Sequence, residues 1–113
     1  GGTRLLSRKT IEMMLSDQLP REAGPMRLVP GGGAYDNLRY GLGIAIVSDL
    51  AGIGRPTSLG TAGWSGSSTT DMLIDRQEDL IIVALTQYRP GDRLWMQRAE
   101  TLAFQALIDE PAK

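Results

Sequence analysis

The chain of 113 residues contains no cysteine and no histidine. Without cysteine it cannot form disulfides, and without either residue it lacks the usual protein ligands of zinc. A Ser-His-Asp triad or a Cys-His pair cannot form within these residues either. We therefore expect no metal site and no cofactor, and both of those catalytic mechanisms are excluded for this chain alone.

An excess of one charge and a long hydrophobic run are also missing. Twelve basic and thirteen acidic residues give a net charge of −1, without the basic excess that binding to nucleic acid requires. The longest apolar runs, such as residues 80–85, are far too short to cross a bilayer, and the N-terminus lacks the order of a signal peptide. We expect no nucleic-acid partner and no membrane segment, and the sequence indicates no compartment.

The length and composition fit one domain or one part of a domain. With 42% hydrophobic residues, the chain can bury a modest core. It begins Gly1-Gly2-Thr3 without a methionine and shows no internal repeat or domain boundary. We therefore expect a single segment over residues 1–113 that is a piece of a longer protein.

A first helix is expected near the N-terminus. Ser7 can cap its free N–H groups, and Leu6 and Ile11 have the spacing of a hydrophobic staple. The helix is expected to run to about Gln18, because Pro20 stops the apolar pattern.

A second helix is expected over residues 93–108, with Asp92 as its cap. We expect it to lie on one face of a sheet, with Trp95 as a core anchor. Its apolar stripe comprises Trp95, Ala99, Leu102 and Ala106, widened by Ala103 and Leu107, opposite Arg98, Glu100 and Gln105.

Four extended segments lie between these helices. Residues 40–47, 57–66, 70–74 and 80–87 have strand patterns, and the polar residues 75–79 predict a turn. The short connections favour antiparallel pairing. The predicted fold class is therefore α+β: an antiparallel sheet of about four strands with a packed C-terminal helix and an N-terminal helix.

Two further patterns carry an alternative interpretation. The loop over residues 20–37 contains three prolines and Gly31-Gly32-Gly33, but no Lys-Ser or Lys-Thr pair follows, so a flexible connector is favoured over a phosphate-binding loop. Asp71, Asp75 and Asp79 are spaced at four and could suggest a cluster of oxygen ligands for a metal. Two of these aspartates bracket a turn and the third belongs to a strand, so we do not expect them to converge.

The segment Gly63-Trp64-Ser65-Gly66 is the strongest candidate for a site. Small residues beside one large aromatic let a ligand lie against a strand edge, with backbone N–H groups free to bind a developing negative charge. The alternative is a glycine-serine edge strand or turn with a surface tryptophan.

Four motifs in this order resemble the C-terminal part of the serine β-lactamase-like hydrolases. This superfamily includes class C β-lactamases, DD-peptidases and family VIII carboxylesterases. The resemblance covers essentially the whole chain, because the order of helices and strands agrees with it as well. The motifs are Arg4-Leu5-Leu6-Ser7, Tyr40-Gly41-Leu42-Gly43, Gly63-Trp64-Ser65-Gly66 and the run DRQEDLIIVALTQ over residues 75–87.

The resemblance implies a β-lactamase/transpeptidase-like fold whose N-terminal strands and nucleophile-bearing helical region lie outside this segment. In that superfamily, a Ser-x-x-Lys motif supplies the nucleophile. The only lysines here are Lys9 and Lys113, and the residues three before them are Leu6 and Glu110. The nucleophile is therefore not in this chain. The remainder of the same hydrolase domain is an expected partner, and we expect the chain alone to be inactive.

The second catalytic motif of the superfamily is Tyr-x-Asn. Tyr35-Asp36-Asn37 matches it literally. In the superfamily, however, that motif lies much further before the edge strand, in a largely helical region. We therefore expect these residues to form a turn after the glycine run.

The third motif is Lys-Thr-Gly on an edge strand, and here Trp64-Ser65-Gly66 takes its place, as similar triplets do in the esterase-like members. The resemblance implies that Ser65 binds substrate, that Gly66 lets the acyl group pass close to the strand, and that the Ser67 backbone N–H completes the oxyanion hole. Trp64 replaces a positive charge with an apolar face, and residues 57–75 contain no basic side chain.

A neutral small-molecule ester or amide is therefore favoured over a β-lactam, and cleavage would proceed through an acyl-enzyme. The alternative is a non-catalytic module of the same fold that binds a peptide or a small ligand.

Overall fold

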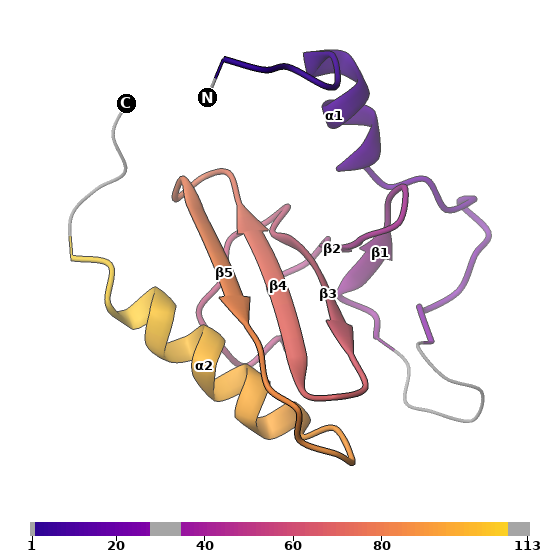
Figure 1. Ribbon diagram of the computed structural model, residues 1–113. Helices are drawn as coiled ribbons and strands as arrows, with labels where there is room; N and C mark the ends of the chain where they lie inside the picture. The colour runs from indigo at the N-terminus through magenta and orange to yellow at the C-terminus, as the bar shows by residue number, and fades with distance from the viewer. Residues whose placement is uncertain (1, 28–34, 109–113) are drawn as a thin grey trace.

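The chain folds into a five-stranded antiparallel sheet with two helices, as described by a computed structural model for residues 2–27 and 35–108 (Figure 1). The strands follow one another across the sheet in the order β1-β2-β3-β4-β5. The α+β prediction is confirmed, with five strands where about four were expected. The elements are α1 (Arg8–Met14), β1 (Leu38–Tyr40), β2 (Ala45–Val47), β3 (Ala62–Gly66), β4 (Thr70–Asp75), β5 (Leu80–Ala84) and α2 (Arg93–Gln105).

The fifth strand arises because the single strand expected over residues 40–47 is a hairpin. Tyr40 ends β1 and pairs with Ala45, the first residue of β2. The Gly41 N–H donates to the Ile44 carbonyl at 2.8 Å, and Gly43 has a φ of +82°, which glycine adopts without a steric penalty. The expectation of one central strand was therefore wrong.

Gly41 of this hairpin marks a close approach to α1. A Cβ at Gly41 would overlap the Met14 carbonyl oxygen at the end of α1. The Leu42 N–H also donates to that carbonyl, at 3.0 Å. The absence of a side chain at Gly41 therefore lets α1 end against the β1–β2 hairpin.

Both N-caps form as predicted, but both helices end earlier than expected. The Ser7 side chain accepts from the Thr10 N–H, and Asp92 caps α2 in the same way. α1 stops at Met14 and not near Gln18, because the Gln18 N–H donates to the Tyr40 carbonyl and draws the chain towards β1. α2 likewise ends at Gln105, before residue 108.

Two strands also have other bounds than the sequence predicted. The segment expected over residues 57–66 becomes a strand only at Ala62, because residues 58–61 turn, with Gly60 at a φ of +85°. β5 ends at Ala84 and does not reach residue 87. The turn expected over residues 75–79 is present between β4 and β5 and comprises residues 76–79, because Asp75 is the last residue of β4.

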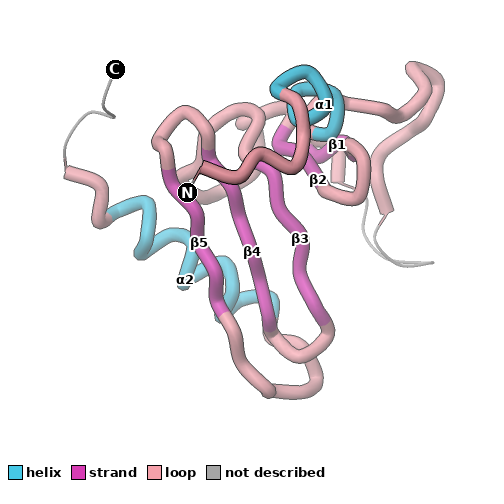
Figure 2. The backbone as a smooth tube through the Cα atoms, turned by 45° about the horizontal axis from the view of Figure 1, so that its top comes forward, coloured by secondary structure: helices cyan, strands magenta, loops and turns pink. Residues whose placement is uncertain are grey.

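α2 lies along one face of the sheet, beside β5, and buries a different side from the one expected (Figure 2). Its buried residues are Met96, Glu100 and Phe104, spaced by four. Trp95 is 41% exposed and Leu102 is 67% exposed, so the stripe built on these two residues was wrong. The buried apolar core of the described chain comprises Ile46, Val47, Ala62, Met96 and Phe104.

The opposite face of the sheet is apolar and is covered by neither helix (Figures 1 and 2). Cross-strand pairing places Trp64, Met72 and Val83 in one row, and Ile74 beside Ile81 in the next. Ile81 and Val83 are 65% and 58% exposed. We call this surface, made of those five residues, the open sheet face. Neither α1 nor α2 is long and apolar enough to span a membrane.

Candidate functional site

The predicted site residues lie at the end of β3, on a stretch of strand that is open on one side. β2 pairs with β3 only at Ala62 and Gly63. Beyond Gly63, the only strand that pairs with β3 within the described chain is β4. Trp64, Ser65 and Gly66 are exposed there, and Ser67 begins the turn to β4. The structure therefore provides the open strand edge that the sequence suggested.

Close backbone approach explains the two glycines of this stretch. A Cβ at Gly63 would overlap the Leu73 side chain and would lie 2.5 Å from the Met72 carbonyl oxygen. A Cβ at Gly66 would overlap the Thr70 hydroxyl. The backbone of β3 is therefore bare at both positions because β4 leaves no room for a side chain.

The turn that carries Ser67 is fixed by the segment after β5. Thr69 is 1% exposed and has a φ of 59°, a conformation that is unusual for a β-branched residue. Its hydroxyl donates to the Tyr88 carbonyl at 3.1 Å and accepts from the Asp92 N–H at 2.8 Å. The Thr86 hydroxyl lies 2.7 Å from the Ser68 carbonyl oxygen. These contacts bind the two residues that follow Ser67 to the segment after β5, and a donor to an oxyanion needs a backbone that is positioned in this way.

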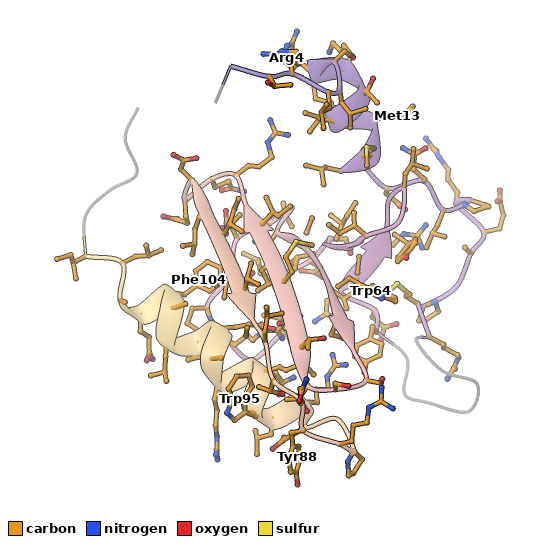
Figure 3. The ribbon with its side chains drawn as sticks, viewed as in Figure 1. Arg4, Met13, Trp64, Tyr88, Trp95 and Phe104 are labelled. Carbon is orange, nitrogen blue, oxygen red and sulfur yellow. The ribbon has the colours of Figure 1, made fainter. Side chains whose placement is uncertain are left out.

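An aromatic pair stands beside the open edge. Trp64, from β3, is 45% exposed (Figure 3). Its ring meets that of Tyr40 edge to face, with centroids 5.3 Å apart. Tyr40 was part of a sequence motif but was assigned no place in the site. It comes near Trp64 only because residues 40–47 fold back as a hairpin.

A small cavity of about 80 Å³ lies between the sheet and α2. Trp64 and Ser65 line this cavity, so it adjoins the open edge of β3. Its other polar lining groups include Arg55, Asp71 and Glu100. None of these three was predicted to contribute to a site.

Asp71 and Glu100 form a buried pair of carboxyl groups, which we call the acid pair. Asp71 is 9% exposed and Glu100 is 6% exposed. Burial, followed by a hydrogen bond to Glu100 and repulsion from its charge, raises the pKa of Asp71 to about 7; the Met72 N–H and Arg55 oppose this shift. The Arg55 guanidinium pairs with Glu100 through its Nε.

The sequence placed Glu100 on the exposed side of α2, so the acid pair was missed. A signal was present, because Met96, Glu100 and Phe104 are spaced by four. Glu100 was placed opposite the apolar stripe, where a charged residue is usually found, because an unpaired carboxylate is rarely buried. Its partner Arg55 lies 45 residues away in the chain, so only the fold brings the two together.

The other two aspartates of the evenly spaced set have separate structural roles. Asp75 accepts from the Thr61 hydroxyl and from the Gln77 N–H, each at 2.9 Å. Burial alone would raise the pKa of Asp75, but the hydrogen bonds that it accepts outweigh burial and lower it. Asp79 occupies a turn position with a φ of 49°. In the part of the chain that the structure describes, no three side chains of metal-ligand type come together.

Tyr35-Asp36-Asn37 leads into β1 as expected for a turn. The Tyr35 N–H donates to the Met26 carbonyl at 2.9 Å, and Asp36 and Asn37 form the turn itself. The guanidinium carbon of Arg93 lies 4.7 Å from the centre of the Tyr35 ring. The Gly31-Gly32-Gly33 run lies outside the described residues.

The sequence matches no known protein family and no curated protein. The geometry of the site and the motifs in the sequence are therefore the basis for a functional assignment.

Proposed function

We propose that this chain is part of a serine β-lactamase-like hydrolase that cleaves a neutral ester or amide through an acyl-enzyme. The observation that carries this proposal is the open edge of β3 at residues 64–66, which leads directly into the fixed turn at Ser67. An extended acyl group can lie along such an edge, and a backbone N–H at its end can stabilise an oxyanion. One such donor contributes roughly 3 kcal/mol at a transition state.

The surroundings of Trp64 favour a substrate without a carboxylate. Trp64 and Tyr40 present aromatic faces where a lysine would present a charge. Of the two arginines that line the cavity, Arg55 pairs with Glu100, and Arg93 lies over the ring of Tyr35. Ser65 is exposed beside Trp64 and has a hydroxyl group for hydrogen bonding to the substrate.

The open sheet face supports the idea that this chain is one part of a larger domain. Ile81 and Val83 alternate along β5 on a face that neither helix covers, and the outer edge of β5 pairs with no strand of the described chain. A soluble protein rarely leaves such an apolar surface in water. We propose that the remainder of the hydrolase domain covers it and supplies the nucleophilic serine.

Labelling with a fluorophosphonate tests the proposal directly. The full-length protein that contains this chain should be labelled on one serine outside residues 1–113, and it should hydrolyse a short-chain p-nitrophenyl ester faster than a chromogenic cephalosporin. Gly66→Val should lower ester turnover at least tenfold, because its side chain would clash with Thr70 and displace the β3 edge. Gly24→Val should not, because a Cβ at Gly24 meets no atom within 4 Å. Lack of labelling in a folded protein would reject the hydrolase.

The isolated chain provides a second test. The 113 residues alone should show no ester turnover, since the Ser-x-x-Lys motif is missing. Turnover by the purified chain that is lost in Ser65→Ala or Ser67→Ala would place the nucleophile within it and overturn this division of roles.

The alternative is a binding module without catalysis, and the aromatic pair at the open edge is the observation that favours it. Such a module would bind a peptide or small ligand at Trp64 without any reaction with fluorophosphonate. Ligand binding would then change the tryptophan fluorescence of the wild type and of Trp95→Phe, but not of Trp64→Phe.

A further inference from the structure

We propose that the acid pair is a proton-dependent contact that holds α2 on the sheet when the two carboxyl groups share a proton and loosens α2 when both are ionised. The acid pair lines the same cavity as Ser65, but this inference concerns the contact of α2 with the sheet and not the proposed hydrolysis. It holds whether the protein is an enzyme or a binding module.

The acid pair lies where α2 packs on the sheet, so its protonation affects the stability of that contact. Glu100 is the middle one of the three buried residues of the helix, between Met96 and Phe104. Asp71 lies on β4, the strand between β3 and β5, and it pairs with Ser65 on β3 and Ala84 on β5. Any repulsion between the two carboxyl groups therefore acts at the centre of the contact between the helix and the sheet.

When both carboxyl groups are ionised, the acid pair and its paired arginine together carry one negative charge in excess. The segment before β3 contributes Arg55, which pairs with Glu100. α2 contributes Arg93 to the same cavity, but the guanidinium of Arg93 lies over the Tyr35 ring. β3 and β5 place the uncharged Ser65 and Ala84 opposite Asp71.

With one shared proton, the two carboxyls and Arg55 are neutral together, and one carboxyl donates a hydrogen bond to the other. With none, two carboxylates meet in a buried site where Arg55 pairs with only one of them, which is costly.

The pH range follows from the direction of the pKa shift. Asp71 has an ordinary pKa of 3.8, which the fold raises to about 7. Between these values the folded chain binds more protons than the unfolded chain, so stability falls as the pH rises and levels off above about 7. The shifts of Asp17 and Asp75 have the opposite sign, because both pKa values are lowered. The stability that Asp17 and Asp75 contribute is lost only when the pH falls below about 4. This lies outside the pH range in which the acid pair affects stability.

Carbon-13 NMR of the side-chain carboxyls and amide hydrogen exchange of α2 test the proposal. We expect the Asp71 carboxyl to titrate near pH 7. Amides of residues 93–105 should exchange at least tenfold faster at pH 8 than at pH 5, after correction for the intrinsic rate. The unfolding midpoint should fall by roughly 5–15 °C over the same range.

Asp71→Asn should abolish both changes, because asparagine keeps the shape of the protonated acid. Asp36→Asn makes the same chemical change at an exposed position and should leave both changes intact.

Two further variants should shift the midpoint of the Asp71 titration in opposite directions. This measurement does not depend on the total stability of the protein. Glu100→Gln removes the like charge and frees Arg55, so the midpoint of the Asp71 titration should fall by more than one pH unit. Arg55→Gln removes the compensating charge, so that midpoint should rise. Titration of wild-type Asp71 near pH 4, or equal protection of α2 at pH 5 and pH 8, would overturn the proposal. The wild-type titration alone decides the matter if a variant does not fold.

Discussion

At the scale of single residues, Thr69 shows how much of this site depends on distant contacts. A β-branched residue at positive φ costs about 1–3 kcal/mol unless other interactions hold it there. Here the Thr69 side chain bonds to the backbone of Tyr88 and Asp92, which follow β5. The conformation of the turn at Ser67 is therefore set by residues that are far from it in sequence.

Replacement of Thr69 tests this dependence. Thr69→Val keeps the shape but removes the hydroxyl, so the Asp92 N–H and the Tyr88 carbonyl each lose a bond. We expect the free energy of unfolding to fall by about 1–3 kcal/mol, measured by urea denaturation. Thr69→Ser keeps both bonds and should cost less than about 1 kcal/mol. Equal losses for the two variants would show that the hydroxyl is not what fixes the turn.

At the scale of elements, α2 shows why an amphipathic pattern can be assigned to the wrong face. Both Leu102 and Met96 are large and apolar, and a stripe through either one is consistent with helical spacing. The sequence analysis placed Glu100 opposite the apolar stripe through Leu102. That glutamate is buried only because Arg55 and Asp71 meet it from other elements.

Alanine substitutions on the two faces of α2 should distinguish these assignments. Met96→Ala removes a side chain that is only 9% exposed and should lower the free energy of unfolding by about 2–4 kcal/mol. Leu102→Ala makes a similar change at a position that is 67% exposed and should cost less than about 1 kcal/mol. The reverse order, measured by chemical denaturation, would restore the face that the sequence favoured.

At the scale of the whole molecule, the two faces of the sheet differ in what covers them. α2 and the segment before β3 bury one face, which contains the acid pair. The open sheet face has only apolar side chains and no helix over it. The described chain therefore forms two layers, the sheet and α2, and no further layer covers the open sheet face.

A lysine on the open sheet face should reduce self-association of the isolated chain but destabilise the longer protein. In the isolated chain, Val83→Lys should shift sedimentation towards the monomer, because it places a charge in the middle of an exposed apolar surface. In the full-length protein it should lower the unfolding midpoint by several degrees, since the remaining domain would bury that charge.

Leu102→Lys, on the outer side of α2, is the matched control and should change neither property. An unchanged midpoint for Val83→Lys in the full-length protein would argue against a covering domain.

Much of the candidate site could be named from the sequence, because its residues are consecutive. Trp64, Ser65 and Gly66 were assigned to a strand edge, and the structure places them on one, with Ser67 in the turn that follows. Tyr40, Asp71, Glu100 and Arg55 could not be assigned in the same way. Each of them contributes through a partner on another element, and a local pattern does not contain that partner.

The sequence by itself determined the features that depend on neighbours along the chain. These are the caps at Ser7 and Asp92, the turn after Asp75, the antiparallel order of the strands and the small residues at the β3 edge. Only the tertiary structure decided that residues 40–47 form a hairpin, which side of α2 is buried, and that two carboxyl groups meet inside the molecule. The physical reason is that a buried charge, a close backbone contact and a helix face are stable only against a specific partner, and folding supplies that partner.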